Sequence, residues 1–323
     1  MKTVKLTTYN EPLDLQFPQK DGILSTAKET YRFILNDPSV TVCDYWILSG
    51  EAGSWKTPTD NHARCPRENV YCLLGESAMI EVYPQDFVQQ FYNIITTQWG
   101  RYSVPKVYFA SVPTWFACYR LDVSSGRMMN TAVRDYTWLQ EHPFPKKTKL
   151  LSIISSNKAW TQGHRDRLQF VNNIMDALGD QVDFFGRGLR TFADKWDVIA
   201  PYKYHIAIEN NAMPGYWTEK IADPFLANTY VFYYGAPDIT AYFPENALTP
   251  IDIHDPVHAI QTIADVINAG TWERRQKELR EARDLVMGKY NYWRILARIL
   301  DQNDYAGDPV DNVILPNEAF KNL

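Results

Sequence analysis

Short apolar runs alternate with longer segments of helical periodicity along most of the chain. The runs are rich in β-branched and aromatic residues and are bounded by turn-forming residues, as buried strands are. They are Tyr45–Leu48, Val70–Leu74, Val107–Ala110, Leu150–Ile154, Val182–Phe185, Tyr204–Ile208 and Thr229–Tyr234. Because strands that alternate with helices form largely parallel sheets, the pattern predicts an α/β fold.

The clearest helix is predicted over Arg165–Leu178, which begins with charged residues and ends before Gly179, a typical C-terminal cap. Its apolar face carries Leu168, Val171, Ile174, Met175 and Leu178. After Pro256 the periodicity predicts two further helical segments, separated by Gly270. The carboxyl-terminal part of the chain is therefore expected to be helical.

A single interdomain linker is predicted at 141–149, where two prolines and a basic run separate two strand and helix patterns. A chain of 323 residues, 45% of them hydrophobic, can bury two cores. We therefore expect two doubly wound, Rossmann-like domains, 1–146 and 147–323, with a cleft between them.

The strand Tyr204–Ile208 is predicted to end at a ligand site. It is followed by Glu209 and Asn210, which are poor strand formers and good hydrogen-bonding residues. After a short loop, Thr218 is suited to cap the next helix. Open α/β sheets bind ligands at the carboxyl ends of strands, and a helix N-terminus favours negative charge. The segment therefore predicts an anion site.

Composition excludes several classes of protein. The formal net charge of −5 argues against a nucleic-acid binder, which needs a cationic face. Four cysteines without a C-x-x-C pair predict free thiols rather than a metal site or disulfides. The start of the chain lacks a hydrophobic signal region, and no stretch approaches the ~20 apolar residues of a membrane span, so we expect no span and a cytoplasmic protein.

Lys220 and Arg167 are the candidate cations of this anion site. We expect no divalent metal, because only Asp252-Ile253-His254-Asp255 superficially resembles a metal motif. Gly186-Arg187-Gly188 follows a strand but lacks the third glycine of a dinucleotide loop. The sequence therefore gives little support for a dehydrogenase.

Three short motifs follow one another at intact spacing. They are Glu209-Asn210, Tyr216-Trp217-Thr218-Glu219-Lys220 and Gly235-Ala236-Pro237. This order resembles the donor-binding signature of the α1,3/4-fucosyltransferase family, and Ser155-Ser156-Asn157, the arginine-bearing helix and the Val182–Gly188 segment extend the resemblance. In the amino-terminal half, Leu74-Gly75-Glu76-Ser77 is similar to the strand-end turn where related bacterial enzymes carry their proposed base.

The resemblance implies a GT-B architecture and inverting transfer of L-fucose from GDP-fucose to a glycan hydroxyl of the GlcNAc or glucose type, carried by an oligosaccharide or a lipid-linked glycan. It implies Glu76 as the base, with Lys220 and Arg167 stabilising the leaving diphosphate and no cofactor. The implied donor-binding residues are Asn210, Tyr216, Glu219, Glu209, Thr218, Arg165, Gly186 and Arg187. The soluble bacterial members that this chain resembles work in the cytoplasm or at the inner face of the membrane.

Several alternatives stay open at this level. Arg165 can replace Arg167 as the donor cation, and Glu81 can replace Glu76 as the base. Pro224 departs from the family pattern inside the predicted helix, so the donor sugar could differ from fucose. A non-catalytic, two-lobed sugar-binding protein would share the aromatic content of 14%, and turnover separates it from an enzyme.

Overall fold

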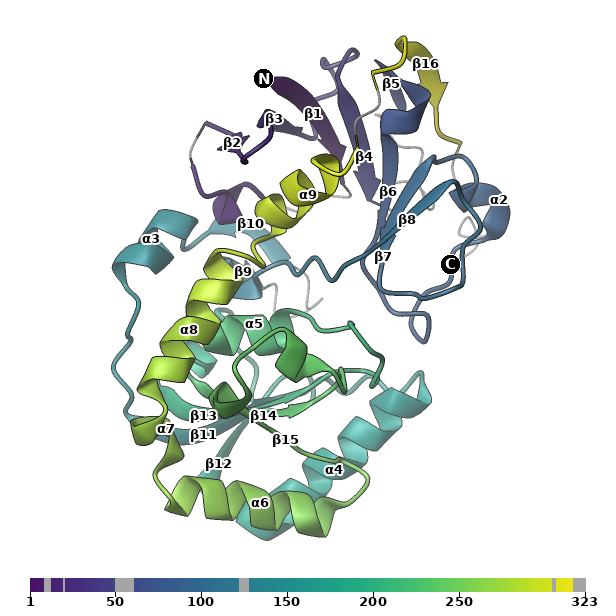
Figure 1. Cartoon of the computed structure of the whole chain (residues 1–323). Coiled ribbons are helices and arrows are strands. Elements are labelled where there is room, and N and C mark those ends of the chain that lie inside the picture. Colours follow the sequence, from purple (N-terminus) through teal and green to yellow (C-terminus); the bar gives the residue numbers. More distant parts are fainter. Residues whose placement is uncertain (9–12, 20, 50–60, 122–127, 304–305, 316–323) are drawn as a thin grey trace. The chain divides into compact units, whose positions relative to one another are not determined.

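The computed structural model describes residues 1–8, 13–19, 21–49, 61–121, 128–303 and 306–315. These residues form two compact units. Unit 1 comprises residues 1–112 together with 292–323, and unit 2 comprises residues 113–291. Figure 1 labels the helices and strands of both units.

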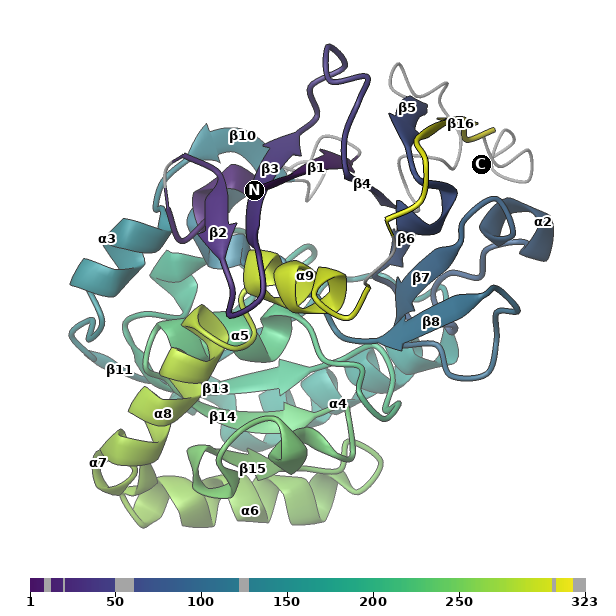
Figure 2. The ribbon, with the colours of Figure 1, turned by 45° about the horizontal axis from the view of Figure 1, so that its top comes forward.

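Unit 1 is built on one mostly parallel sheet (Figures 1 and 2). The strand order is β2-β3-β1-β4-β6-β7-β8, and only the β2–β3 pair is antiparallel. The strands are β1 (Lys2–Thr7), β2 (Ile23–Ser25), β3 (Thr30–Leu35), β4 (Tyr45–Ser49), β6 (Val70–Leu74), β7 (Asn93–Thr96) and β8 (Lys106–Phe109). A separate antiparallel pair joins β5 (His62–Cys65) to β16 (Val310–Val313). The helices are α2 (Gln85–Val88) and α9 (Tyr292–Leu300).

The carboxyl-terminal helix α9 belongs to unit 1. The indole Nε1 of Trp293 donates to the carbonyl oxygen of Leu13 at 3.1 Å. The same ring packs against Phe17 and Phe33, with centroids 4.8 and 5.2 Å away. The chain therefore returns to its first unit after it has completed the second.

Unit 2 contains a fully parallel sheet in the order β12-β11-β13-β14-β15. Its strands are β11 (Lys149–Ile154), β12 (Val182–Phe185), β13 (Tyr202–Ile208), β14 (Tyr230–Tyr234) and β15 (Leu248–Pro250), and β9 (Tyr119–Leu121) pairs antiparallel with β10 (Met128–Ala132). Its helices are α3 (Tyr136–Glu141), α4 (Gln162–Leu178), α5 (Glu219–Leu226), α6 (Pro256–Asn268), α7 (Thr271–Arg274) and α8 (Gln276–Met287). Helices α4 and α6 lie on one face of the sheet, and α5 and α8 lie on the other (Figures 1 and 2).

Short 3-10 helices complete the two units. They are η1 (Leu13–Gln16), η2 (Arg67–Asn69), η3 (Phe116–Cys118), η4 (Gly179–Gln181), η5 (Trp196–Val198), η6 (Ile239–Ala241) and η7 (Glu245–Ala247). Within the described ranges, every helix is too short or too polar to cross a bilayer.

The local predictions hold closely in unit 2. Val182–Phe185 is a strand as predicted, and the first predicted helix begins at Gln162 and ends at Leu178, with Gly179 as its C-cap. The helix after the anion-site loop begins at Glu219, with Thr218 as its N-cap. Pro224 lies inside that helix, so the carbonyl four residues earlier receives no hydrogen bond from it.

The segment 141–149 is not a free linker. Lys147 lies in it, and its Nζ donates to the carbonyl oxygens of Ala200 and Ala227 at 2.9 and 2.6 Å and contacts Thr229 Oγ1 at 2.7 Å. Burial lowers the pKa of this amine well below its ordinary value. The segment is therefore fixed within unit 2, and the two units divide at 112/113 and 291/292 rather than at the single position expected near 146.

Unit 2 extends before that segment because of a buried ion pair. Arg134 donates to both carboxylate oxygens of Asp194, at 2.9 and 2.8 Å. Each side chain is only 10% exposed. A bidentate ion pair of this kind holds both side chains in one geometry. The residues from 113 onward are therefore bound to the second unit.

Candidate active site

The candidate site lies where the parallel strands of unit 2 end. β11, β13 and β14 are neighbours, and β12 flanks β11, so the residues that follow these strands meet at one edge of the sheet. They are Ser155-Ser156, Gly186-Arg187, Glu209-Asn210 and Gly235. Helices α4 and α5 begin at the same edge, since each follows a parallel strand (Figure 1). This is the edge at which open α/β sheets bind ligands.

Two backbone contacts at this edge require glycine. A Cβ atom on Gly163 would lie 1.9 Å from the carbonyl oxygen of Asn210, and one on Gly186 would lie 1.8 Å from that of Ser155. Gly186 also has a φ of 129°, which side chains other than glycine's rarely allow. The first turn of α4 is thus packed directly against the end of β13.

Arg167 is a buried cation whose fork is oriented by the strand ends. Its Nη1 donates to Oδ1 of Asn210 at 2.7 Å, and its Nη2 donates to the carbonyl and hydroxyl oxygens of Ser156, each at 3.1 Å. Its Nε has no hydrogen-bond partner, and Arg167 forms no ion pair with any described residue. Burial lowers its pKa. A buried guanidinium without a counter-ion is prepared for an anionic ligand.

Positive charge surrounds the first turn of α4. His164 lies in that turn, where it forms a capping box with the N-cap Thr161. Burial lowers the pKa of His164, and repulsion from four neighbouring cations lowers it further. Those cations are Arg167, Lys158, Lys220 and Arg165. The N-terminal end of α4 adds its own dipole to this field, so an anion is favoured here.

Glu209 braces the start of α5. Its carboxylate is fully buried and accepts the backbone N–H of Thr218 at 2.8 Å and the Thr218 hydroxyl at 2.9 Å. Lys220 Nζ lies 3.3 Å from Oε2 of Glu209. Burial raises the pKa of Glu209, although the charge of Lys220 opposes that shift. In this arrangement Glu209 holds the loop and the lysine in place.

Glu219 and Lys220 belong to a network of alternating charges. Lys220 Nζ lies 3.5 Å from Oε1 of Glu219, and Lys195 Nζ lies 3.8 Å from the same oxygen. Lys195 also pairs with the fully buried Asp223 at 2.7 Å. Burial pushes the pKa of Glu219 upward, but Lys220 and Lys195 outweigh it, so this pKa is lowered. Glu219 therefore stays ionised and suits hydroxyl donors.

Burial raises the pKa of Asp223 to about 6, against the opposing charge of Lys195. The pattern of motifs did not point to Lys195 or to Asp223. In the sequence, Lys195 belongs to none of the motifs, and Asp223 looks like an ordinary acidic residue of a helix. Their contact is visible only in three dimensions.

The remaining predicted donor residues of unit 2 differ in exposure. Tyr216 is buried, and its N–H donates to the carbonyl of Met213 at 3.1 Å. Arg165 is exposed and donates to Gln162 Oε1 and to the carbonyl of Ala159, at 2.9 and 3.1 Å, so it helps to order the loop before α4. Arg187 is exposed at the end of β12. Arg167 is the more deeply buried of the two arginines on α4.

Glu76 lies in unit 1. It follows β6 after Gly75 and is partly exposed. The buried side-chain amide of Gln98 donates to the carbonyl oxygens of Glu76 and Glu81, at 2.9 and 3.0 Å. The turn that carries the predicted base is thus held by a side chain from the loop that follows the neighbouring strand, β7.

No group of three or more His, Cys, Asp and Glu side chains in the described ranges is arranged to hold a metal ion. The carboxylates of Asp252 and Asp255 instead accept backbone N–H groups of His254 and His258, at 2.9 and 3.2 Å. Asp255 caps α6 by this bond. The superficial metal motif of the sequence is therefore a capping turn.

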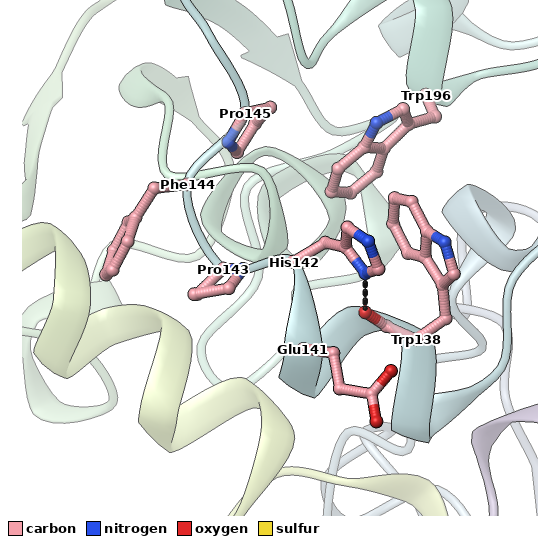
Figure 3. A pocket seen from close by; sticks show the side chains of 7 residues that line it. All are labelled: Trp138, Glu141, His142, Pro143, Phe144, Pro145 and Trp196. Carbon is pink, nitrogen blue, oxygen red and sulfur yellow. Dashed lines mark hydrogen bonds between the residues drawn. The ribbon is translucent and has the colours of Figure 1, made fainter.

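A separate pocket of about 380 Å³ lies elsewhere in unit 2 (Figure 3). It is lined by Trp138, Glu141, His142, Pro143, Phe144, Pro145 and Trp196. These residues precede β11 and β13, so the pocket lies toward the amino ends of the strands, whereas the candidate site lies at their carboxyl ends. None of the predicted site residues lines it.

The chain is similar to several known glycosyltransferases. Residues 144–269 match the family described as "Glycosyltransferase family 10 (fucosyltransferase) C-term". A curated relative, GDP-fucose protein O-fucosyltransferase 3 of Danio rerio, is 27% identical over 123 residues, which are 33% of this chain and 26% of the relative. Crystal structures of an α1,3-fucosyltransferase with GDP and with GDP-fucose align over 94% of this chain and 91% of theirs, with a TM-score of 0.52 and 16% identity.

Fold and comparisons together define the class of structure: the chain has the GT-B fold of glycosyltransferases. Within that class, residues 144–269 resemble a glycosyltransferase family 10 (fucosyltransferase) C-terminal domain. The α/β fold and the family resemblance predicted from the sequence are confirmed.

Proposed function

We propose that the protein transfers L-fucose from GDP-fucose to a hydroxyl of a glycan acceptor, with inversion at the anomeric carbon. The observation that carries the proposal is the buried Arg167, which has no counter-ion among the described residues and lies at the N-terminal end of α4. A diphosphate supplies the negative charge that this position lacks. The α1,3-fucosyltransferase that shares the fold was crystallised with GDP-fucose, which supports the same donor here.

In the proposed reaction, the acceptor oxygen attacks the anomeric carbon of fucose while the bond from that carbon to the diphosphate oxygen breaks. The electron pair of the broken bond remains on GDP, whose charge Arg167 and Lys220 stabilise. The proton of the acceptor hydroxyl passes to the carboxylate of Glu76. Because the attack comes from the side opposite to the leaving group, a single displacement inverts the anomeric configuration.

The donor contacts follow from the charges at the strand ends. We infer that Glu219, ionised and partly exposed, accepts from hydroxyls of the sugar or ribose rather than approaching the phosphates. Asn210 keeps an amide N–H₂ for the ligand while its oxygen accepts from Arg167. Glu209, Thr218 and Tyr216 shape the loop, and Gly186 and Arg187 flank the donor at the end of β12.

The acceptor is proposed to be an oligosaccharide or lipid-linked glycan that binds to the unit containing residues 1–112. The curated relative carries the name of a protein O-fucosyltransferase, so a peptide acceptor is the alternative to test.

A cytoplasmic location is proposed as well. All four cysteines are free, as expected for a reducing compartment, and cell fractionation tests the location.

The decisive experiment offers the purified chain a panel of nucleotide sugars and acceptors. Release of the nucleotide diphosphate and the mass of the product are measured for each pair. We expect GDP-fucose to support turnover, with one deoxyhexose added to a glycan and inverted configuration by NMR. Turnover with another nucleotide sugar alone would change the donor. Binding of sugars without any turnover would leave a sugar-binding protein.

A further inference from the structure

Two aromatic side chains are stacked in an exposed position on unit 1. The rings of Trp99 and Phe109 lie parallel, with centroids 3.6 Å apart and an interplanar angle of 3°. Trp99 is 63% exposed and Phe109 is 40% exposed. One face of the indole is thus covered by a neighbouring ring, while most of the side chain remains in contact with solvent. A stacked, exposed aromatic pair offers a flat apolar face that a ligand can cover.

The stack lies at the edge of the sheet that carries Glu76. Leu74 at the end of β6 is paired with Thr96 at the end of β7, and Thr96 is paired with Phe109 at the end of β8. Glu76 lies two positions after Leu74, and Gln98 lies two positions after Thr96. Trp99 comes directly after Gln98. Three neighbouring parallel strands thus bring the predicted base and the aromatic stack to the same edge.

Gln98 connects the two features rigidly. Its buried amide donates to the carbonyl oxygens of Glu76 and Glu81, and its Oε1 accepts the Tyr102 hydroxyl at 2.8 Å. Backbone adjacent to Trp99 is consequently fixed relative to the Glu76 turn. A ligand that covers the indole face would be held in register with the carboxylate.

We propose that Trp99, supported from behind by Phe109, is a stacking platform for a pyranose ring of the acceptor. This inference rests on the proposed function and deepens it. A pyranose presents a flat array of C–H groups on one face, which packs on an indole, and hydroxyls at its rim. Glu76 at the same edge accepts one of those hydroxyl protons. Trp99 is a positioning residue in this account, because it orients the acceptor without touching the bond that breaks.

The test measures binding of simple glycosides to the full chain by saturation-transfer NMR. The probes are the methyl β-glycosides of N-acetylglucosamine, glucose and galactose. The variants are Trp99→Ala, Trp99→Phe and, as a matched control, Phe144→Ala, which removes an aromatic ring that is 52% exposed in unit 2. We expect transfer to the C–H protons of at least one glycoside, and a Kd about tenfold weaker in Trp99→Ala. Trp99→Phe should retain most of the affinity, and Phe144→Ala should retain all of it.

Failure of this inference is distinguishable from failure of the proposed function. On the same samples, GDP binding and hydrolysis of GDP-fucose without acceptor are measured, and neither should change in Trp99→Ala. An unchanged glycoside Kd in Trp99→Ala overturns the platform, as does a wild-type chain that binds none of the three glycosides. Equal loss of GDP binding would also overturn it, since the substitution would then act through the fold. A chain that binds the glycosides but not GDP-fucose contradicts the proposed donor instead.

Discussion

Arg167 and Asn210 meet across the carboxyl edge of the sheet in unit 2, with the guanidinium Nη1 donating to the amide Oδ1 at 2.7 Å. The first residue lies on α4 and the second directly follows β13. Their contact orients the guanidinium from one side and uses only the acceptor oxygen of the amide. Both side chains consequently keep donor groups for a ligand, which suits an anion with neighbouring hydroxyls.

Replacing Arg167 by Ala should weaken binding of GDP by about 10- to 100-fold, because a charge-assisted hydrogen bond contributes about 1.5–3 kcal/mol. Arg167→Lys should recover only part of the affinity, since an ammonium group cannot reproduce the fork. Isothermal titration calorimetry with GDP measures both. Arg275→Ala, which removes an exposed arginine paired with Glu278, is the control. Equal affinity in Arg167→Ala and wild type would contradict the assignment.

Replacing Lys220 by Ala should slow transfer more than it weakens donor binding. A fixed charge beside the departing diphosphate is worth about 2–4 kcal/mol in the transition state. Steady-state kinetics with GDP-fucose would then show a fall in kcat of about 30- to 1,000-fold. Lys203→Ala is the matched control, because it removes a lysine that pairs with Glu273 at the amino end of β13, away from the carboxyl ends of the strands. If Lys220→Ala turned over at the wild-type rate, the diphosphate would be stabilised by other groups.

Chelation should leave the rate unchanged. We expect this because Arg167 and Lys220 supply fixed positive charge at the proposed diphosphate position. Turnover of GDP-fucose is measured before and after dialysis against EDTA, and then with added manganese or magnesium. Activity that disappears with EDTA and returns only with a divalent cation would show that the fixed charges do not suffice.

The sequence predicted strands in which apolar residues predominate. Val70–Leu74 is completely buried, and its run of apolar residues is the local signature of a central parallel strand. β1 and β7 were missed because at least half of their residues are polar. Lys5 is 1% exposed, and its Nζ donates to the carbonyls of Val40 and His62, while Asn93 donates to that of Val70. Their partners lie far away in sequence, so no local pattern reveals them.

The contacts of the candidate site likewise divide into those that the sequence predicts and those that it does not. Contacts within the motif, such as that of Glu209 with Thr218, follow from residue types at a fixed spacing. The pair of Lys195 with Asp223 joins a loop to a helix from another part of the chain, and a lone lysine carries no signal of that contact. Gly163 is a further example, because the carbonyl that excludes its Cβ belongs to Asn210 on a different strand end.

Acid should destabilise unit 2 through His205. This ring is buried and bonded to Ser152 Oγ at 2.8 Å, and burial lowers its pKa to about 3. The unfolded chain binds a proton near pH 6.5, whereas the folded one does not, so stability is complete above pH 6.5 and falls as pH drops toward 3. Urea midpoints at pH 7.0 and 5.5 should differ less in His205→Gln than in wild type. The exposed His258→Gln should keep the wild-type difference.

Replacing Glu76 by Gln should lower the transfer rate by about 10²-fold or more, the usual scale for a lost general base, while GDP binding and the unfolding temperature stay unchanged. Glutamine keeps the size of the side chain, and the backbone carbonyl that accepts from Gln98 is unaffected. Glu81→Gln is the comparison, since Gln98 donates to its carbonyl as well. If Glu81→Gln lost the rate and Glu76→Gln kept it, the base would be Glu81 instead of Glu76.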